Sequence, residues 1–163
     1  MTIKANGDSG VKIAADMTLD WHDWADLSAA QLYELLQFRQ AIFVVEQGSP
    51  YADLDGRDAR AQHLLLRRGE QLIGCLRLIG PDPLVRIGRV AVKAGERGRG
   101  LARMMMEAAL QRAAEVYPHR DVALSAQTYL APFYQSFGFV ISSTPYDDYG
   151  VPHIDMIGPA RGV

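Results

Sequence analysis

The chain has little of what marks secreted, membrane and nucleic-acid-binding proteins. It has one cysteine, Cys75, in 163 residues, so an internal disulfide is excluded. No apolar run approaches the length of a secretory signal or a membrane span. The formal net charge of −2 leaves no bulk positive charge for binding nucleic acid. We therefore expect a cytoplasmic protein with neither a nucleic-acid nor a membrane partner.

Internal repeats and low-complexity tracts are missing as well, and the length suits a single hydrophobic core. Residues 1–16 are polar and show no clear periodicity. Chain ends of this kind are usually loosely held. We therefore predict a flexible N-terminal tail at 1–16 and one α/β domain at 17–163.

Periodicity and capping residues locate the elements of this domain. Ser28 and Gln31 have the spacing of a capping box, which predicts a helix that runs to about Arg39. The turn-rich, acidic residues 46–60 that follow predict a long loop. The remaining predicted elements are strands near 17–21, 63–67, 72–79, 84–92 and 121–126, helices at 101–116 and 130–137, and two strands within 139–158.

One predicted strand carries a break in its alternation. The apolar side chains of VRI, residues 85–87, share one parity, whereas those of VAV, residues 90–92, share the other. Successive strand residues point to opposite faces, so one extra residue between these segments would return both to the same face. We therefore predict a β-bulge near Gly88 and Arg89.

The segment GERGRGLA, residues 95–102, is rich in glycine and arginine and stands directly before a predicted helix. A helix N-terminus presents unpaired N–H groups, and glycines let a phosphate approach them. A P-loop would need Lys and Ser or Thr where Leu101 and Ala102 stand, so it is excluded. A Rossmann fingerprint needs a glycine in place of Arg103 and is a weak match. The alternative is that this segment binds nothing, and that its glycines form a tight turn while its arginines are solvated.

The six residues from Arg97 to Ala102 fit the pattern R/Q-x-x-G-x-G/A, and they resemble the pyrophosphate loop of the GNAT acetyltransferases. AQTYLAPFYQSFGF resembles that family's stretch in which a polar side chain precedes a tyrosine by seven residues. With FVVEQGSPYADLDGRD, QHLLL, IGRVAV and GVPHIDM, the chain from Leu19 to Ile157 is similar to the ElaA-like branch of the family. The resemblance implies an α/β GNAT acyl-CoA N-acyltransferase fold: a central mixed sheet with a bulged, splayed strand and flanking helices.

The resemblance also implies acetyl-CoA (coenzyme A) as cosubstrate, lying where the bulged strand parts from its neighbour. It implies direct transfer of an acetyl group to a primary amine of a small molecule or peptide, and a homodimer is one assembly that the sequence allows. Gln127 stands where the family usually has Asn. The cofactor-binding residues implied are Val90, Ala91 and Val92 for pantetheine, Arg97, Gly98, Arg99, Gly100, Leu101 and Ala102 for pyrophosphate, and Gln127.

Acetyl transfer to an amine uses a base that keeps the amine neutral and an acid that protonates the departing thiolate. The resemblance implies that Tyr134 is the acid, although a tyrosine between two phenylalanines at helical spacing also suits a core position. Glu46, His63, His153 and water are the candidates for the base, and Glu46 is ranked first.

Other reactive side chains receive different interpretations. Cys75 lies in the apolar segment LIGCLRLI, which favours a buried small hydrophobe over a nucleophile. Asp53 and Asp55 begin like a calcium loop, but Asp58 occupies the position that requires glycine, so no metal site is predicted. The acidic loop residues are expected either to gather at the open end of the cleft and favour a cationic amine, or to form a solvated surface. These residues are Asp53, Asp55, Asp58, Asp147 and Asp148.

Two other functions stay open on the sequence alone. A non-catalytic acyl-CoA-binding regulatory module would have the same cleft without turnover. A Rossmann-type oxidoreductase would bind a nicotinamide cofactor instead of coenzyme A. Release of a thiol in the presence of an amine distinguishes the transferase from both.

Overall fold

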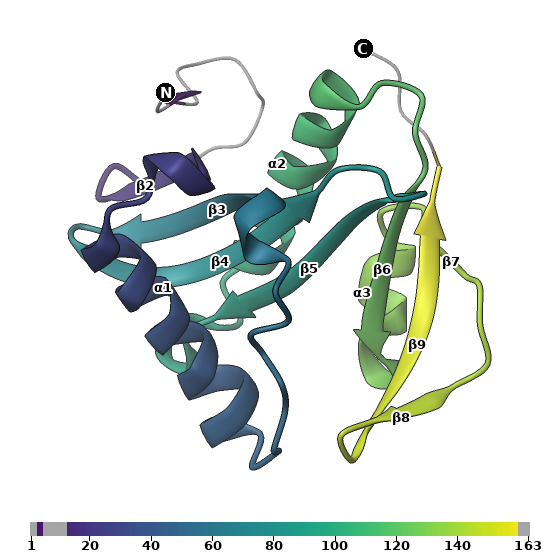
Figure 1. The fold of residues 1–163 in the computed structure, drawn as a ribbon. Helices are drawn as coiled ribbons and strands as arrows, with labels where there is room; N and C mark the ends of the chain where they lie inside the picture. Colours follow the sequence, from purple (N-terminus) through teal and green to yellow (C-terminus); the bar gives the residue numbers. More distant parts are fainter. Residues whose placement is uncertain (1–2, 5–12, 160–163) are drawn as a thin grey trace.

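The computed structural model describes residues 3–4 and 13–159, whose strands form one mixed sheet with helices packed on it (Figure 1). The strands are β1 (Ile3–Lys4), β2 (Met17–Asp23), β3 (Ala61–Arg68), β4 (Gln71–Ile79), β5 (Val85–Val92), β6 (Val122–Gln127), β7 (Val140–Ile141), β8 (Tyr146–Asp148) and β9 (Val151–Gly158). The helices are α1 (Ala29–Gln40), α2 (Leu101–Val116) and α3 (Ala131–Gln135). The strand order is β1-β2-β3-β4-β5-β6-β9-β7, with β8 paired to β9. The predicted α/β class is confirmed.

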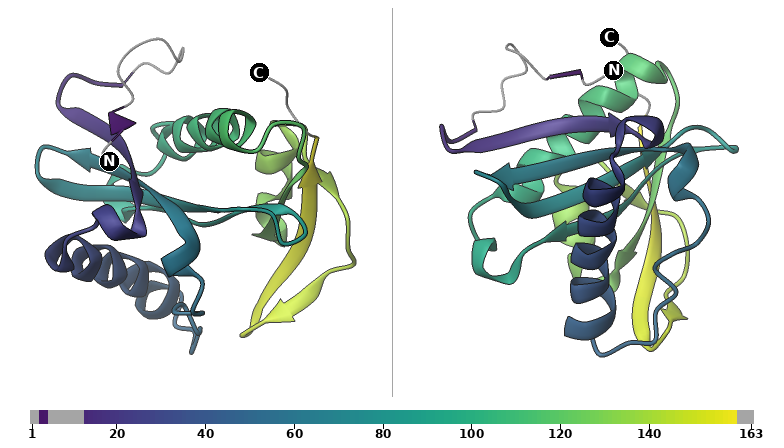
Figure 2. Two further views of the ribbon diagram at one scale, coloured as in Figure 1. Left: turned by 45° about the horizontal axis from the view of Figure 1, so that its top comes forward. Right: turned by 60° about the vertical axis from the view of Figure 1, so that its left-hand side comes forward.

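The two longer helices cover opposite faces of the sheet (Figure 2). On one face, α2 packs against β3, β4 and β5, and Met105 belongs to the same buried cluster as Leu64 and Leu66. On the other face, Leu35 of α1 belongs to a second cluster with Leu65. Strand β3 therefore buries side chains on both faces, which explains the uninterrupted apolar run in its sequence.

Helix α1 begins as the sequence predicts. The Ser28 Oγ accepts a hydrogen bond from the Gln31 amide at 3.1 Å, and the Gln31 Oε1 accepts one from the Ser28 amide at 2.9 Å. This reciprocal pair confirms the predicted capping box. After Gln40 the chain continues as a π-helical segment, Ala41–Glu46. Helix α1 and this extension place the loop of residues 47–60 beside the point where β5 and β6 separate.

The predicted bulge lies in β5. Cys75 pairs with Ala91 and Arg77 pairs with Gly88, so two residues of β5 stand opposite one residue of β4. One of these two, Arg89, has a φ of 54°, in the left-handed region that residues with a side chain rarely occupy. The change of alternation in the sequence therefore has the cause that we expected, and the prediction is confirmed.

Strand β5 parts from β6 along most of its length. The two strands run parallel and pair only at Val85 with Val122 and at Arg86 with Ala123. Toward the C-terminal end of β5 they diverge, while β6 continues in register with β9 (Figure 1). The central mixed sheet with a bulged, splayed strand is therefore confirmed.

The C-terminal elements add one strand to the prediction. β8 lies inside the segment expected to be a turn-rich excursion, and it forms a hairpin with β9. Tyr149 and Gly150, at the tip, have φ values of 51° and 85°. Positive φ at both central residues is typical of the tight turns that join paired strands, so the turn residues mark a hairpin rather than a loop.

Most of the predicted N-terminal tail, residues 1–2 and 5–12, lies outside the described residues, so its flexibility stays a prediction. Ile3 and Lys4 pair with β2, and the Asp16 carboxylate forms an ion pair with Arg68. Within the described residues, none of the helices has the length and apolar character needed to cross a membrane.

Candidate functional site

A large cleft of about 560 Å³ lies at the split between β5 and β6. The extension of α1, the bulged strand, the start of α2 and the segment around α3 form its walls. Nine of the ten predicted cofactor-binding residues line it: Val90, Ala91, Val92, Arg97, Gly98, Gly100, Leu101, Ala102 and Gln127. The tenth, Arg99, is not among the lining residues and forms an ion pair with Glu96 at 3.2 Å.

The glycine loop at the start of α2 has the geometry of an anion site. Gly98 and Gly100 have φ values of 75° and 77°, a conformation that favours glycine. The Gly100 carbonyl accepts the first helical hydrogen bond, from the Met104 amide at 3.1 Å. The amides of the first turn consequently lie beyond the reach of the helix's own carbonyls and carry its partial positive charge. The Arg97 guanidinium lies beside them, held by a hydrogen bond from its Nε to the Val92 carbonyl at 2.9 Å and paired with the Glu46 carboxylate.

Two smaller cavities continue from the large cleft past the bulge. An inner pocket of about 100 Å³ shares Val90, Gln127 and Tyr134 with the large cleft. An outer pocket of about 140 Å³ shares the bulge residue Arg89 and His153 with the inner pocket. The three cavities therefore adjoin one another at the split in the sheet, and Tyr134 lines both the large cleft and the inner pocket.

Tyr134 projects from α3 and is 7% exposed. Its ring makes edge-to-face contacts with Phe133 and Phe139, at centroid distances of 5.0 and 6.3 Å. Burial, with a smaller contribution from Tyr129, raises the pKa of its hydroxyl to about 12. The hydroxyl is therefore protonated across the physiological range and can act as a hydrogen-bond donor to a reacting atom.

The three side chains considered for the base lie in different places. Glu46 lines the large cleft and forms an ion pair with Arg97, whose hydrogen bonds lower the pKa of the carboxyl. A lowered pKa weakens a general base. His63 is 1% exposed, its Nε2 lies 2.9 Å from the Asp58 carbonyl, and burial lowers its pKa. Only His153 lines the inner and outer pockets.

His153 is oriented by two neighbours on the β8–β9 hairpin. Its Nδ1 lies 2.8 Å from the Val151 carbonyl. A carbonyl only accepts hydrogen bonds, so Nδ1 carries the proton and the lone pair of the neutral ring is on Nε2. Nε2 lies 3.8 Å from the Asp148 carboxylate.

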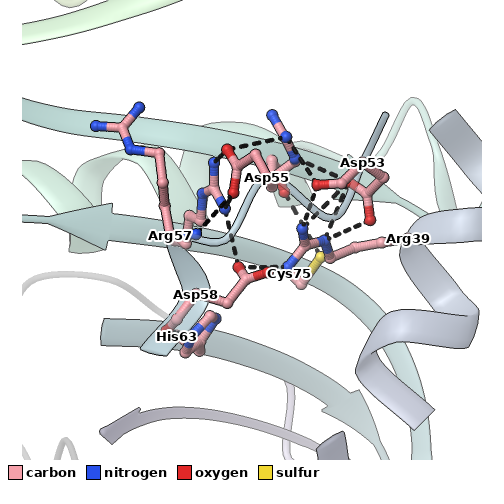
Figure 3. Close-up of polar contacts among 9 residues, drawn as sticks. Arg39, Asp53, Asp55, Arg57, Asp58, His63 and Cys75 are labelled. Carbon is pink, nitrogen blue, oxygen red and sulfur yellow. Dashed lines mark hydrogen bonds and ion pairs between the residues drawn. The ribbon is translucent and has the colours of Figure 1, made fainter. Parts of the chain in front are cut away.

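The acidic loop does not present its carboxylates to the cleft as free charges. Six side chains form an ion cluster, buried or partly buried except at Asp55, in which three arginines neutralise three aspartates (Figure 3). Asp53 and Asp58 are 6% and 7% exposed. Burial alone would raise the pKa of Asp55, but its arginine partners hold it well below its ordinary value. The expectation that these three residues attract a cationic amine is therefore wrong. The cluster comprises Arg39, Arg77, Arg89, Asp53, Asp55 and Asp58.

The ion cluster ties the loop to the bulge. Arg39 Nε lies 3.0 Å from Asp53 Oδ2, and Arg39 Nη1 lies 2.7 Å from Asp58 Oδ1. Arg89 Nη2 donates to the Asp53 carbonyl at 2.9 Å. These contacts hold Arg89 in its left-handed conformation and fix the loop that walls the inner pocket. Arg77, in the middle of an apolar strand, was a signal for such a cluster that the sequence analysis missed.

Cys75 is buried in the core, and the described side chains that could ligate a metal ion lie apart. Cys75 is 1% exposed, and burial raises the pKa of its thiol to about 12. A thiol of this kind is unreactive, so its interpretation as a buried small hydrophobe is confirmed. Among the described residues, no group of three or more His, Cys, Asp or Glu side chains is arranged to hold a metal ion.

Comparisons with known proteins show which family and which solved structures this chain resembles. The family model described as "Acetyltransferase (GNAT) domain" matches residues 26–158. Protein ElaA of Escherichia coli is 40% identical over 146 residues, which are 85% of this chain and 95% of that protein. The crystal structure of E. coli ElaA has a TM-score of 0.83 and covers 87% of this chain and 99% of that one. An acyl-CoA N-acyltransferase from Pseudomonas aeruginosa, 40% identical, has a TM-score of 0.81 and covers 86% of this chain and 99% of that one.

Proposed function

This chain belongs to the GNAT acetyltransferase family, in its ElaA-like branch, and on that premise we propose that it transfers an acetyl group from acetyl-CoA directly to a primary amine. The observation that carries the proposal is the continuity of the cavities. The large cleft meets the inner pocket at Tyr134, so a thioester in one and an amine in the other would come together beside that hydroxyl.

The large cleft suits the cofactor in shape and charge. The amides at the start of α2, with Arg97 beside them, would hold the pyrophosphate. The backbone of residues 90–92 lines the same cleft and is unpaired on the side of β6, so it is free to pair with pantetheine. Arg99 does not line the cleft and is paired with Glu96, so we expect it to contribute less to binding than Arg97.

His153 is better placed than Glu46 to serve as the base. In its neutral form it would accept the amine proton at Nε2, directly or through water, while Asp148 stabilises the charge that results. The amine nitrogen then forms a bond to the thioester carbon and the carbon–sulfur bond breaks. The thiolate takes a proton from solvent, and His153 returns the amine proton to solvent, so that one thiol and one amide are formed. Glu46 would act on the other side, by orienting Arg97.

Tyr134 and the bulge would stabilise the charges that develop. The Tyr134 hydroxyl would donate a hydrogen bond to the departing sulfur. The bulge leaves a backbone group of β5 outside the ladder, and a free N–H there would stabilise the negative charge on the thioester oxygen. Both contributions act on charge that appears only during the reaction, which is the condition for catalysis.

Two measurements test the proposed function. Native mass spectrometry and calorimetry would detect binding of coenzyme A, and a thiol-release assay with a panel of amines would detect turnover. Binding together with amine-dependent thiol release is expected. Binding without release for any amine would favour the regulatory module, and preferential binding of a nicotinamide cofactor would favour the oxidoreductase.

A further inference from the structure

The charges around the outer pocket do not balance. The ion cluster is neutral as a whole, because its three arginines meet three aspartates. Two further arginines, Arg57 and Arg86, line the outer pocket and form no ion pair with another described residue. Outside the ion cluster, Asp148 is the acid among the described residues that line this pocket, and it faces His153. The outer pocket therefore holds excess positive charge.

Arg57 is oriented by its backbone and not by an acidic partner. Its amide donates to Asp55 Oδ1 at 3.1 Å, which fixes the start of the side chain. Its guanidinium extends away from the ion cluster, and its Nε is buried with no hydrogen-bond partner among the described residues (Figure 3). Burial, followed by the nearby charges of Arg60 and Arg77, lowers its pKa. Asp55 acts against this lowering, but among the described residues no carboxylate lies within ion-pair distance of the Arg57 guanidinium.

Arg86 approaches the same space from the sheet. It lies in the last residue pair before β5 leaves β6, opposite Ala123. Gly88, two residues further on, lines both the inner and the outer pocket. A Cβ at Gly88 would meet only the Arg77 Nε, at 4.0 Å, so the space beside this residue is open. The inner pocket, which Tyr134 lines, and the outer pocket, which the arginines line, adjoin at Gly88.

We propose that the amine acceptor carries a compact anionic group, a carboxylate or a phosphate, which binds Arg57 and Arg86 in the outer pocket while the amine enters the inner pocket. This inference rests on the proposed function and names its substrate class. Guanidinium groups match carboxylate and phosphate oxygens through paired hydrogen bonds. The combined space of the two pockets suits a small molecule such as an amino acid or an aminoalkyl phosphate.

The charges of Arg57 and Arg86 disfavour the cationic amine acceptor that the sequence suggested. A polyamine or a lysine-rich peptide would place a second cation beside two unpaired arginines, which costs free energy instead of gaining it. Three of the five acids expected to attract such an acceptor, Asp53, Asp55 and Asp58, are paired with arginines within the ion cluster. An acceptor with both an amine and an acid instead neutralises the outer pocket on binding.

The test compares acceptors that differ in one charge. Amino acids, each paired with its own carboxamide, and aminoalkylphosphonates are assayed by thiol release from acetyl-CoA. The same panel is assayed with Arg57→Gln and Arg86→Gln, and with Arg120→Gln as a control. Arg120 is exposed, lies outside the three cavities, and its replacement changes the net charge by the same amount.

The acid should be preferred over its carboxamide. Each of the two pocket variants should reduce kcat/KM for the acid about 10- to 100-fold, the usual effect of losing a charge-assisted hydrogen bond, while the carboxamide is affected much less. The ranking of carboxylates and phosphonates then identifies the anion. Equal use of acid and carboxamide, or equal losses in Arg57→Gln and Arg120→Gln, would overturn the inference while leaving the transferase intact.

A binding measurement covers the case in which no amine is acetylated. Calorimetry of the acids and carboxamides is carried out on the protein saturated with coenzyme A. Tighter binding of the acids that depends on Arg57 and Arg86, without thiol release, would support the anion site and refute the transferase. Equal binding of acids and carboxamides would refute the anion site, and thermal unfolding of each variant shows whether it is folded.

Discussion

Replacement of Tyr134 by phenylalanine removes one oxygen atom and keeps the ring contacts with Phe133 and Phe139. Among the described residues the hydroxyl has no hydrogen-bond partner, and it borders two cavities. Its loss should therefore change the free energy of unfolding by less than about 1 kcal/mol. The affinity for coenzyme A should stay the same, since the pyrophosphate and pantetheine contacts lie elsewhere.

Turnover should fall by about 100-fold, the usual effect of removing one hydrogen-bond donor to a developing negative charge. The pKa of about 12 for Tyr134 lies far above that of a departing thiol, about 8.5, so complete proton transfer is unfavourable and a hydrogen bond is the main contribution. The loss should appear equally in kcat and kcat/KM, measured by thiol release, because the interaction forms as the sulfur departs.

The raised pKa of Tyr134 also predicts a pH dependence of stability. The folded protein keeps this proton up to about pH 12, whereas the unfolded chain loses it near its ordinary value of 10.0. The protonated Tyr134 hydroxyl therefore makes its full contribution to the free energy of unfolding below pH 10. This contribution, about 2–3 kcal/mol, is lost as the pH rises toward 12. Urea unfolding between pH 9 and 11.5 should show this loss in the wild type and a smaller one in Tyr134→Phe.

One pair of results would refute this reasoning. If Tyr134→Phe unfolds at clearly lower urea at neutral pH and its folded fraction turns over normally, the tyrosine is a core residue. The proton donor to the sulfur would then have to be water or another group that lines the inner pocket.

Gly100→Val should abolish coenzyme A binding in calorimetry while circular dichroism shows a folded protein, because a β-branched residue disfavours the φ of 77° that the loop needs; unchanged affinity would exclude this placement. Glu46→Gln should alter the KM for acetyl-CoA and leave kcat within a few-fold, whereas His153→Gln should lower kcat/KM for the amine by about 100-fold. If instead Glu46→Gln lowers kcat/KM for the amine and His153→Gln does not, Glu46 is the base. Arg39→Leu should lower the free energy of unfolding by about 3–5 kcal/mol, because it leaves Asp53 and Asp58 buried with one cationic partner fewer; a loss below 1 kcal/mol in urea titration would contradict the ion cluster.

Local sequence signals predicted the elements that frame the site. The capping box at Ser28 depends on residues three apart, and the bulge in β5 depends on a change of parity within nine residues. The glycine loop before α2 needed only adjacent residues and the known chemistry of a helix N-terminus. Each of these signals is contained in one short segment, so a single sequence suffices to find it.

The tertiary structure decided which charged residues meet. Arg39 and Asp53 are neighbours because α1, its π-helical extension and the following loop fold back on themselves, and no local pattern encodes that return. His153 reaches the inner pocket because β9 pairs with β6 across the split, which depends on strand order. The sequence shows which charged residues are present, and the fold decides which of them meet. Asp53, Asp55 and Asp58, three of the five aspartates that predicted a cationic acceptor, are neutralised by distant arginines, and the arginines left unpaired favour an anionic acceptor.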